Sequence, residues 1–164
     1  MQMSEKEMFI QTWEREFQTT LKLLKEYPAH KLELKPAEKS RSAKDLAWTF
    51  VLEENALVGG AIKGNIDFQN MPKPPGTLQE IISKYEQSHQ ENVQKVKNLP
   101  DDEFNKTMKF FTGPKQMGDV RKGDVFWTGV MDTVHHRGQF SVYLRMAGAK
   151  VPSIYGPSAD EPWM

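Results

Sequence analysis

Hydrophobic residues recur at helical spacing in four stretches of the chain, and the first of these stretches opens on a clear helix start. Ser4 is followed three residues later by Glu7, which is the capping-box pattern of a helix N-terminus. The residues after it place a hydrophobic position every three or four residues, at Phe9, Trp13, Phe17, Leu21 and Leu24. The pattern predicts a helix over residues 5–26.

The second hydrophobic stretch has a similar start and a clear end. Ser42 with Asp45 resembles another cap, and Leu46, Phe50 and Leu57 follow at helical spacing. The pattern weakens at a group of glycines, and the sequence "NMPKPPG" that comes next contains three prolines, which cannot continue a helix. We therefore expect a helix over residues 43–63.

The third and fourth stretches complete the set. Thr77 and Glu80 form another capping box, and the hydrophobic spacing after them predicts a helix over residues 78–99. For the fourth, Asp124 is the expected cap of a helix over residues 125–147, and the following glycine suits a left-handed helix end.

Two segments lack a helical pattern. Residues 101–122 mix a short alternating stretch with turn residues, so a hairpin and an irregular crossover are both open, and we treat the segment as a loop. Residues 149–164 are rich in proline and form a tail without helical period.

Four amphipathic helices of about twenty residues are typical of an all-α four-helix bundle. With 164 residues, the chain has the size of a single domain, residues 1–164. The long connections between the first and second helices, and between the third and fourth, leave room for crossovers.

The charge balance and the composition exclude several classes of function. Lys and Arg number 22, Asp and Glu also number 22, and no basic stripe is present, so we expect no nucleic-acid partner. No run of about 18 apolar residues occurs and the start does not resemble a signal peptide, so we expect no membrane partner and a cytoplasmic location. Without cysteine, a metal would need imidazole, carboxylate or hydroxyl ligands.

The fourth predicted helix carries polar residues on one face. At about 100° per residue, the face contains Val125, Gly129, Asp132, His136, Gln139 and Tyr143. The other faces are also largely hydrophobic, which is typical of a buried helix, so we expect Asp132 and His136 to lie away from bulk water. A buried carboxylate needs a partner, because burying its charge alone costs several kcal/mol.

Three partners for the carboxylate are open. Asp132 and His136 lie four residues apart and can form a structural ion pair. They can instead be two ligands of a divalent metal whose other ligands come from other helices. Or the carboxylate can orient a histidine that transfers protons near neutral pH.

The sequence "HHRGQFSVYLRMAGAKVPSIYGPSADE", residues 135–161, resembles the C-terminal signature of the DinB superfamily of DinB/YfiT-like four-helix bundles. "SAKDLAW", residues 42–48, and the spacing of the four helices extend the resemblance over most of the chain. The resemblance implies a metal-dependent enzyme with a divalent ion of the nickel or zinc class on three histidines.

Of the three histidines that the resemblance implies, one matches. His136 stands directly before "RGQ" and matches one of them. Thr49 stands after "LAW", where the resemblance implies the histidine of the second helix. Asp132 stands four residues before His136, where it implies the other histidine of the fourth helix. Aspartate is a competent ligand for zinc, manganese or iron, but a threonine hydroxyl is a poor one. Glu53, one turn after Thr49, could complete a set of two carboxylates and one histidine. The alternative is that Glu53 reaches solvent or pairs directly with His136. The neighbouring Glu54 favours this alternative, because we expect its charge to be exposed.

Other polar residues have simpler expected roles. His135 points about 100° away from His136, so we expect it at the surface or in a cap, at the edge of the pocket. We expect Arg137 and Arg145 to form ion pairs or to fix the tail, and His89 to be a core histidine that could also face the pocket.

The resemblance also implies the chemistry and the partners. Related transferases and isomerases use a low-molecular-weight thiol such as bacillithiol, mycothiol or glutathione, and Gln139 and Tyr143 could orient such a thiol beside a small-molecule substrate. A homodimer is also implied. The opposing hypothesis is a stress-response or binding protein that keeps the bundle without the chemistry, for which Thr49 is the main argument.

Overall fold

The structure, a computed structural model, describes residues 2–164 and contains four long α-helices. They are α1 (Glu5–Glu26), α2 (Ala43–Lys63), α3 (Leu78–Lys97) and α4 (Lys122–Met146). The helical bundle is the fold expected from the sequence. The bounds of α1 and α2 are those predicted, whereas α3 ends two residues before the predicted end and α4 begins three residues before the predicted start.

Local capping explains why the sequence predicted where the first three helices begin. The side chain of Ser4 accepts a hydrogen bond from the Glu7 backbone N–H, and the Glu7 carboxylate accepts one from the Ser4 backbone, so the capping box is complete. Thr77 and Glu80 do the same at α3. The fourth cap differs from the prediction, because Asp124 lies inside α4 and accepts hydrogen bonds from Arg121.

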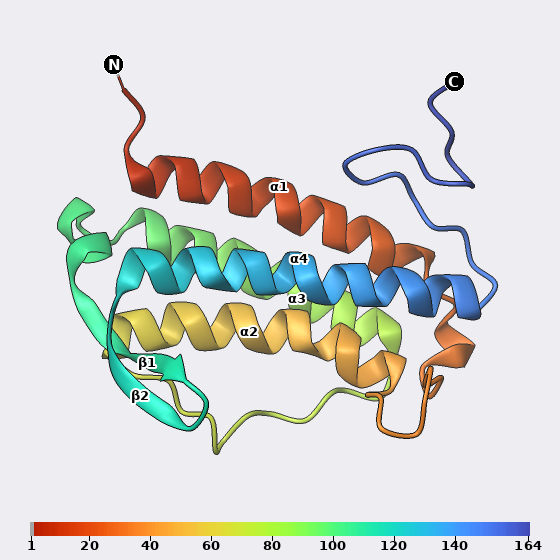
Figure 1. Ribbon diagram of the computed structural model, residues 1–164, viewed down its shortest axis with the longest axis horizontal. Helices are drawn as coiled ribbons and strands as arrows, with labels where there is room; N and C mark the ends of the chain where they lie inside the picture. The colour runs from red at the N-terminus through yellow and green to blue at the C-terminus, as the bar shows by residue number, and fades with distance from the viewer. Residues whose placement is uncertain (1) are drawn as a thin grey trace.

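The four helices lie side by side, with α4 between α1 and α2, and α3 on the opposite side of the bundle (Figure 1). α1 and α4 run in one direction, and α2 and α3 run in the other (Figure 1). Two consecutive parallel helices require a connection that runs the length of the bundle. Residues 64–77, which we call the crossover segment, form this connection. We expected crossovers after the first and the third helix, whereas the structure has one after the second.

A β-hairpin stands between α3 and α4, where we expected a loop. A short 3₁₀ helix, Asp101–Asn105, leads into β1 (Thr107–Gly113), which pairs antiparallel with β2 (Gln116–Arg121). The Lys109 backbone N–H donates to the Gly64 carbonyl, which fixes the hairpin to the end of α2. Met108 is buried in the core, but none of the other residues of β1 and β2 is, so the hydrophobic pattern was too weak to predict the hairpin.

The apolar core consists of two clusters, one toward each end of the bundle. One cluster contains Phe17, Phe50, Tyr85 and Phe140, and the other contains Phe9, Trp13, Phe104 and Phe126. Every long helix contributes to both clusters. Between them lie the polar side chains at the helix centres, which we call the middle polar layer: Glu16, Glu53, Glu54, His89, Asp132, His136 and Arg137.

The tail, residues 149–164, leaves the C-terminal end of α4 and folds back over the C-terminal half of α1 (Figure 1). Arg145 pairs with Asp160 at 2.6 Å, and Lys22 of α1 pairs with Glu161 at 2.9 Å. The tail begins after Gly148, whose φ of 75° lies in the left-handed region, as the sequence predicted for this helix end.

Within residues 2–164, none of the helices combines the length and the apolar character that a membrane span requires.

Candidate metal centre and its cavity

The antiparallel packing of α2 against α4 brings Glu53, Asp132 and His136 together. Glu53 projects from the middle of α2, and Asp132 and His136 lie one turn apart on the face of α4 that packs toward it. One ligand atom from each of the three side chains lies within 4.8 Å of the other two, which makes them a candidate metal centre. The sequence offered these three residues as one possible ligand set, and a direct pairing of Glu53 with His136 as the alternative; the structure places the two side chains within ion-pair distance.

The distances within the centre are short, but the groups do not satisfy one another. His136 Nδ1 lies 3.0 Å from Glu53 Oε1 and 3.8 Å from Asp132 Oδ1. Even so, His136 Nδ1 and Glu53 Oε2 are both buried, and neither has a hydrogen-bond partner with acceptable geometry. Two buried polar atoms without partners are costly, and a shared cation between them would satisfy both.

The three side chains differ in exposure. The His136 side chain is 10% exposed and that of Glu53 is 21% exposed, but that of Asp132 is 48% exposed. The expectation that Asp132 lies away from bulk water is therefore wrong. Asp132 lines a cavity and is about half exposed, so its charge can be hydrated.

The electrostatics of the centre follow from this burial. Burial raises the pKa of Glu53, because the charged carboxylate loses hydration. The Glu53 carboxylate beside the imidazole raises the pKa of His136, because it stabilises the protonated ring. The buried Glu53 carboxylate therefore gains from a nearby positive charge, which either the protonated His136 ring or a bound cation would supply.

Thr49 does not join the three candidate ligands. Its hydroxyl donates to the Asp45 carbonyl at 2.9 Å and accepts a hydrogen bond from the Arg41 guanidinium, also at 2.9 Å. The hydroxyl is therefore fully engaged. Where the resemblance implies a histidine ligand, this chain has a side chain that holds an arginine.

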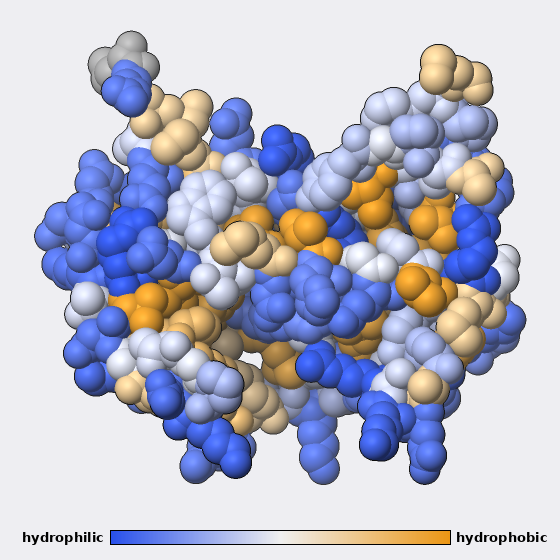
Figure 2. Space-filling view, viewed as in Figure 1, coloured by the Kyte–Doolittle hydropathy of each residue, from blue (hydrophilic) through white to orange (hydrophobic). Residues whose placement is uncertain are grey.

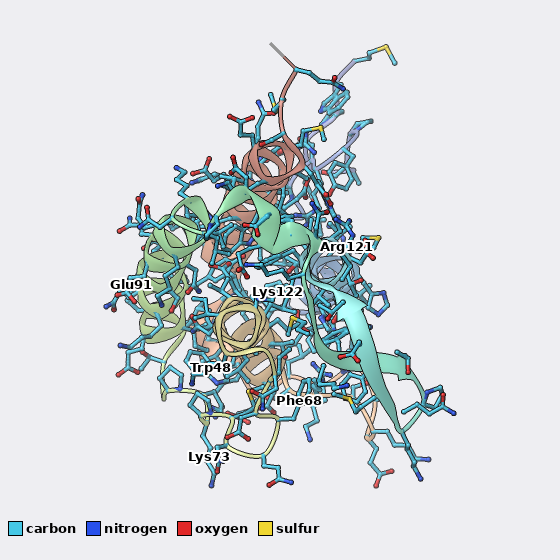
Figure 3. All side chains as sticks on the ribbon, turned by 90° about the vertical axis from the view of Figure 1, so that its left-hand side faces the viewer. Trp48, Phe68, Lys73, Glu91, Arg121 and Lys122 are labelled. Carbon is cyan, nitrogen blue, oxygen red and sulfur yellow. The ribbon has the colours of Figure 1, made fainter. Side chains whose placement is uncertain are left out.

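A cavity of about 600 Å³ opens beside the centre, between α2, α4, the hairpin and the crossover segment. Its apolar lining includes Trp48, Leu52, Phe68, Met71 and Phe110. Trp48 lies on the side of α2 that faces the crossover segment, to which Phe68 belongs (Figure 3). The Trp48 indole N–H donates to the Pro72 carbonyl of this segment at 2.8 Å. Figure 2 shows a hollow below α4 on this side of the bundle, with hydrophobic surface at its rim.

Three of the predicted pocket residues line a different cavity. His135, Gln139 and Tyr143 border a second cavity of about 550 Å³, together with His136 and Arg41, whereas Thr49 borders the first. Gln139 donates to a ring nitrogen of the exposed His135. The Tyr143 hydroxyl donates to the Arg41 carbonyl at 2.8 Å, so it holds the chain before α2.

Glu54, which we expected to be exposed, is buried in the core. His89 Nδ1 lies 3.0 Å from its carboxylate, and the His89 ring stacks on Phe17 at 3.8 Å between ring centroids. Burial raises the pKa of Glu54. His89 is thus a core histidine, as expected, and it does not line either cavity. The pairing joins residues 35 apart on different helices, so no local pattern could show it.

Arg137 forms the ion pair that was expected of it. Its guanidinium contacts the Glu16 carboxylate at 2.7 Å, and these two side chains are 1% and 3% exposed. The Tyr155 hydroxyl from the tail hydrogen-bonds to both groups, and the Arg137 guanidinium lies over the Tyr155 ring. The conspicuous "HHRGQ" sequence therefore combines one candidate ligand with one structural ion pair.

Two features of the site were missed. Arg41 borders both cavities, and the crossover segment and β1 supply part of the apolar wall. Arg41 sits directly before the Ser42 cap, which could have placed it beside the start of α2. No sequence signal indicated that residues 64–77 return along the bundle.

The three candidate ligands fit a divalent ion. Two carboxylates and one imidazole form a donor set that suits zinc, manganese or iron(II). Three protein ligands beside an open cavity leave coordination positions for other groups, which is the pattern of catalytic metal sites. The unpartnered His136 Nδ1 and Glu53 Oε2 are the observation that supports this fit.

Fold and site together describe a helical-bundle protein with a candidate metal centre beside an apolar cavity. The DinB family model matches residues 1–163, and the chain belongs to the DinB family. It is 30% identical over 159 residues to the uncharacterized protein YrdA of Bacillus subtilis (strain 168), a match that covers 93% of this chain and 89% of YrdA.

Two solved structures have a similar fold. A DinB-like protein from Bacillus cereus ATCC 10987 matches with a TM-score of 0.75 and 23% identity, over 90% of this chain and 95% of that one. The DinB-like protein YjoA from Bacillus subtilis matches with a TM-score of 0.74 and 19% identity, over 90% of this chain and 97% of that one.

Proposed function

We propose that this chain is a metal-dependent enzyme that holds one divalent ion between Glu53, Asp132 and His136 and acts on a small molecule in the larger cavity. The observation that carries the proposal is the pair of buried atoms without hydrogen-bond partners, His136 Nδ1 and Glu53 Oε2. His136 Nδ1 lies 3.0 Å from Oε1, the other oxygen of the Glu53 carboxylate. Zinc, manganese, iron and nickel are the candidate ions.

The reaction we propose is a thiol-dependent transfer, with a low-molecular-weight thiol as cosubstrate. A divalent ion at the centre would lower the pKa of a bound thiol and so supply a nucleophile near neutral pH. The chain itself has no cysteine, so the thiol must arrive from solution. Two cavities border the centre, and His136 and Arg41 line the second, so there is room for two small molecules.

The chain's own residues have separable roles in this proposal. Glu53 and His136 bind from the buried side, and Asp132 binds from the rim, where its exposure leaves it accessible to an incoming ion. The apolar wall formed by Trp48, Phe68 and their neighbours excludes water from the substrate's body.

A second candidate is a non-catalytic binding protein of the same fold. The observation that favours it is the engagement of Thr49 with Arg41, which removes one of the ligands implied by the resemblance. In this case Glu53 and His136 form an ion pair, and no divalent ion raises the stability of the protein.

Metal analysis and thermal shift separate the two candidates. Protein purified without chelator is tested against Ni, Zn, Mn and Fe(II). A bound ion at a hundredfold excess over its Kd should stabilise the fold by about 2.7 kcal/mol. His136→Ala should abolish this stabilisation, whereas His135→Ala, at the exposed neighbouring residue, should retain it. If none of the four ions raises the melting temperature of the wild type, the non-catalytic candidate stands.

A further inference from the structure

Arg41 is an arginine that the fold holds in place beside the larger cavity. Its backbone carbonyl accepts a hydrogen bond from the Tyr143 hydroxyl of α4 at 2.8 Å. Its guanidinium donates to Thr49 of α2 at 2.9 Å. The backbone of Arg41 is thus held by α4 and its guanidinium by α2, although the residue is exposed.

The charge of Arg41 has no counter-ion within the part of the chain that the structure describes. No carboxylate of residues 2–164 forms an ion pair with it. Asp45, which lies four residues further on and also lines the cavity, accepts a hydrogen bond from the Ser42 hydroxyl at 2.7 Å. Most of the guanidinium N–H groups therefore remain free for a ligand, and their planar fork matches carboxylate and phosphate oxygens.

The cavity beside Arg41 is mainly apolar. Its volume of about 600 Å³ is within the range of small-molecule sites. Trp48, Leu52 and Phe68 are among the lining residues, and Lys73 of the crossover segment also borders it. Lys73 lies on the same side of α2 as Trp48 (Figure 3), so the cavity combines an apolar wall with two cationic side chains. The carboxylates of Asp45, Glu53 and Asp132 line it as well, so an anion is favoured only directly at the guanidinium.

We propose that the cavity takes an amphipathic anion, with its carboxylate or phosphate on Arg41 and its apolar body against the wall formed by Trp48, Leu52 and Phe68. In this proposal Thr49 is a positioning residue, which orients the guanidinium and binds no metal. The inference rests on the proposed function in taking this cavity as the substrate site, and it names the chemical class of that substrate.

Calorimetric titration with three eight-carbon probes tests the proposal. Octanoate and octyl phosphate carry the two candidate anions, and 1-octanol offers the same chain without charge. All titrations contain EDTA, so the result does not depend on whether the metal centre binds an ion. The carboxylates of Asp45, Glu53 and Asp132 are present in every protein that is compared, so their repulsion of an anion cancels between variants, whereas in the wild type it counts against the anions relative to 1-octanol and makes that comparison the stricter test.

The wild type should bind at least one of the two anions more tightly than 1-octanol. Arg41→Gln should weaken that anion's binding about tenfold and leave 1-octanol within about twofold, because the lost contact is a charge-assisted hydrogen bond. Thr49→Val keeps the shape of the side chain but removes the anchor of the guanidinium, and it should weaken the anion by about threefold.

Lys39→Gln is the matched control, because it removes the same charge two residues away on an exposed side chain that borders neither cavity. Equal weakening by Lys39→Gln and Arg41→Gln would overturn the proposal, since it would show a general effect of net charge. An anion affinity no greater than that of 1-octanol, or an anion affinity unchanged in Arg41→Gln, would also overturn it. Circular dichroism verifies that each variant is folded.

Discussion

Arg137 is the most deeply buried charged side chain in the middle polar layer, and its environment sets the cost of removing it. Its guanidinium contacts Glu16 at 2.7 Å, and both side chains are almost completely buried. Arg137→Met should therefore lower the free energy of unfolding by about 3–5 kcal/mol, because it leaves the Glu16 carboxylate buried without a partner. Urea denaturation measures the loss.

A double variant shows whether the loss comes from the stranded charge. Arg137→Met combined with Glu16→Met replaces both members with apolar side chains and should recover a large part of the stability. A double variant less stable than Arg137→Met alone would contradict the explanation.

If the candidate centre binds a metal as proposed, His136 gives that binding a defined dependence on pH. Its folded-state pKa is raised above 6.5 by the Glu53 carboxylate, and a protonated imidazole cannot bind a metal. As pH rises through the raised pKa, the ring loses its proton and the competition disappears. The zinc-induced rise in melting temperature should thus be larger at pH 8 than at pH 6. An equal or larger rise at pH 6 would show that His136 is not a ligand.

The candidate ligands could be predicted from single residues, but their partners could not. The spacing of Asp132 and His136 and the position of Glu53 on a hydrophobic helix face are local properties of the sequence. The pairing of Glu54 with His89 and the contact between Arg41 and Thr49 depend on how elements pack. A carboxylate on a helix gives no sign of which helix will cover it, and Glu54 was misplaced for this reason.

At the scale of the elements, the tail depends on carboxylates that titrate in acid. Glu161 accepts hydrogen bonds from Lys22 and from the Ser153 backbone and hydroxyl, which lower its pKa to about 2. A lowered folded-state pKa gives stability that is present above the ordinary value of 4.5 and is lost as pH falls through about 2.

Glu161→Gln tests the contribution of this carboxylate. The wild type should lose more stability than Glu161→Gln as the pH falls from 4.5 toward 2, because the variant has no proton to take up at this position. The midpoint of urea unfolding, measured at a series of pH values, gives the comparison. Parallel curves for the two proteins would show that Glu161 does not hold the tail.

The helices could be predicted better than their connections, for a physical reason. Capping boxes such as Ser4 with Glu7 act within one helical turn, so the sequence specifies the helix starts directly. The crossover segment is defined by the direction of α3, which results from packing of the whole bundle. Met108 is the one buried residue of the two hairpin strands, so the alternating pattern was weak.

For the whole molecule, the two apolar clusters should unfold together. All four long helices pass through both clusters, so neither end of the bundle can lose its packing without disturbing the other. Variants that retain only Trp13 or only Trp48 report on the two ends, since these residues belong to different clusters. Their fluorescence midpoints in urea should coincide with each other and with circular dichroism, and separated midpoints would contradict a single cooperative unit.

Other expectations for the whole molecule remain predictions. These are the formation of a homodimer and a location in the cytoplasm.

The central claim is that Glu53, Asp132 and His136 bind one divalent ion, and a crystal soaked in zinc tests it most directly. Anomalous scattering at the zinc edge should show one peak between the three side chains, at about 2.0–2.2 Å from each ligand atom. A well-diffracting soaked crystal with no peak at this position, or with zinc only at exposed histidines such as His135, would contradict the claim.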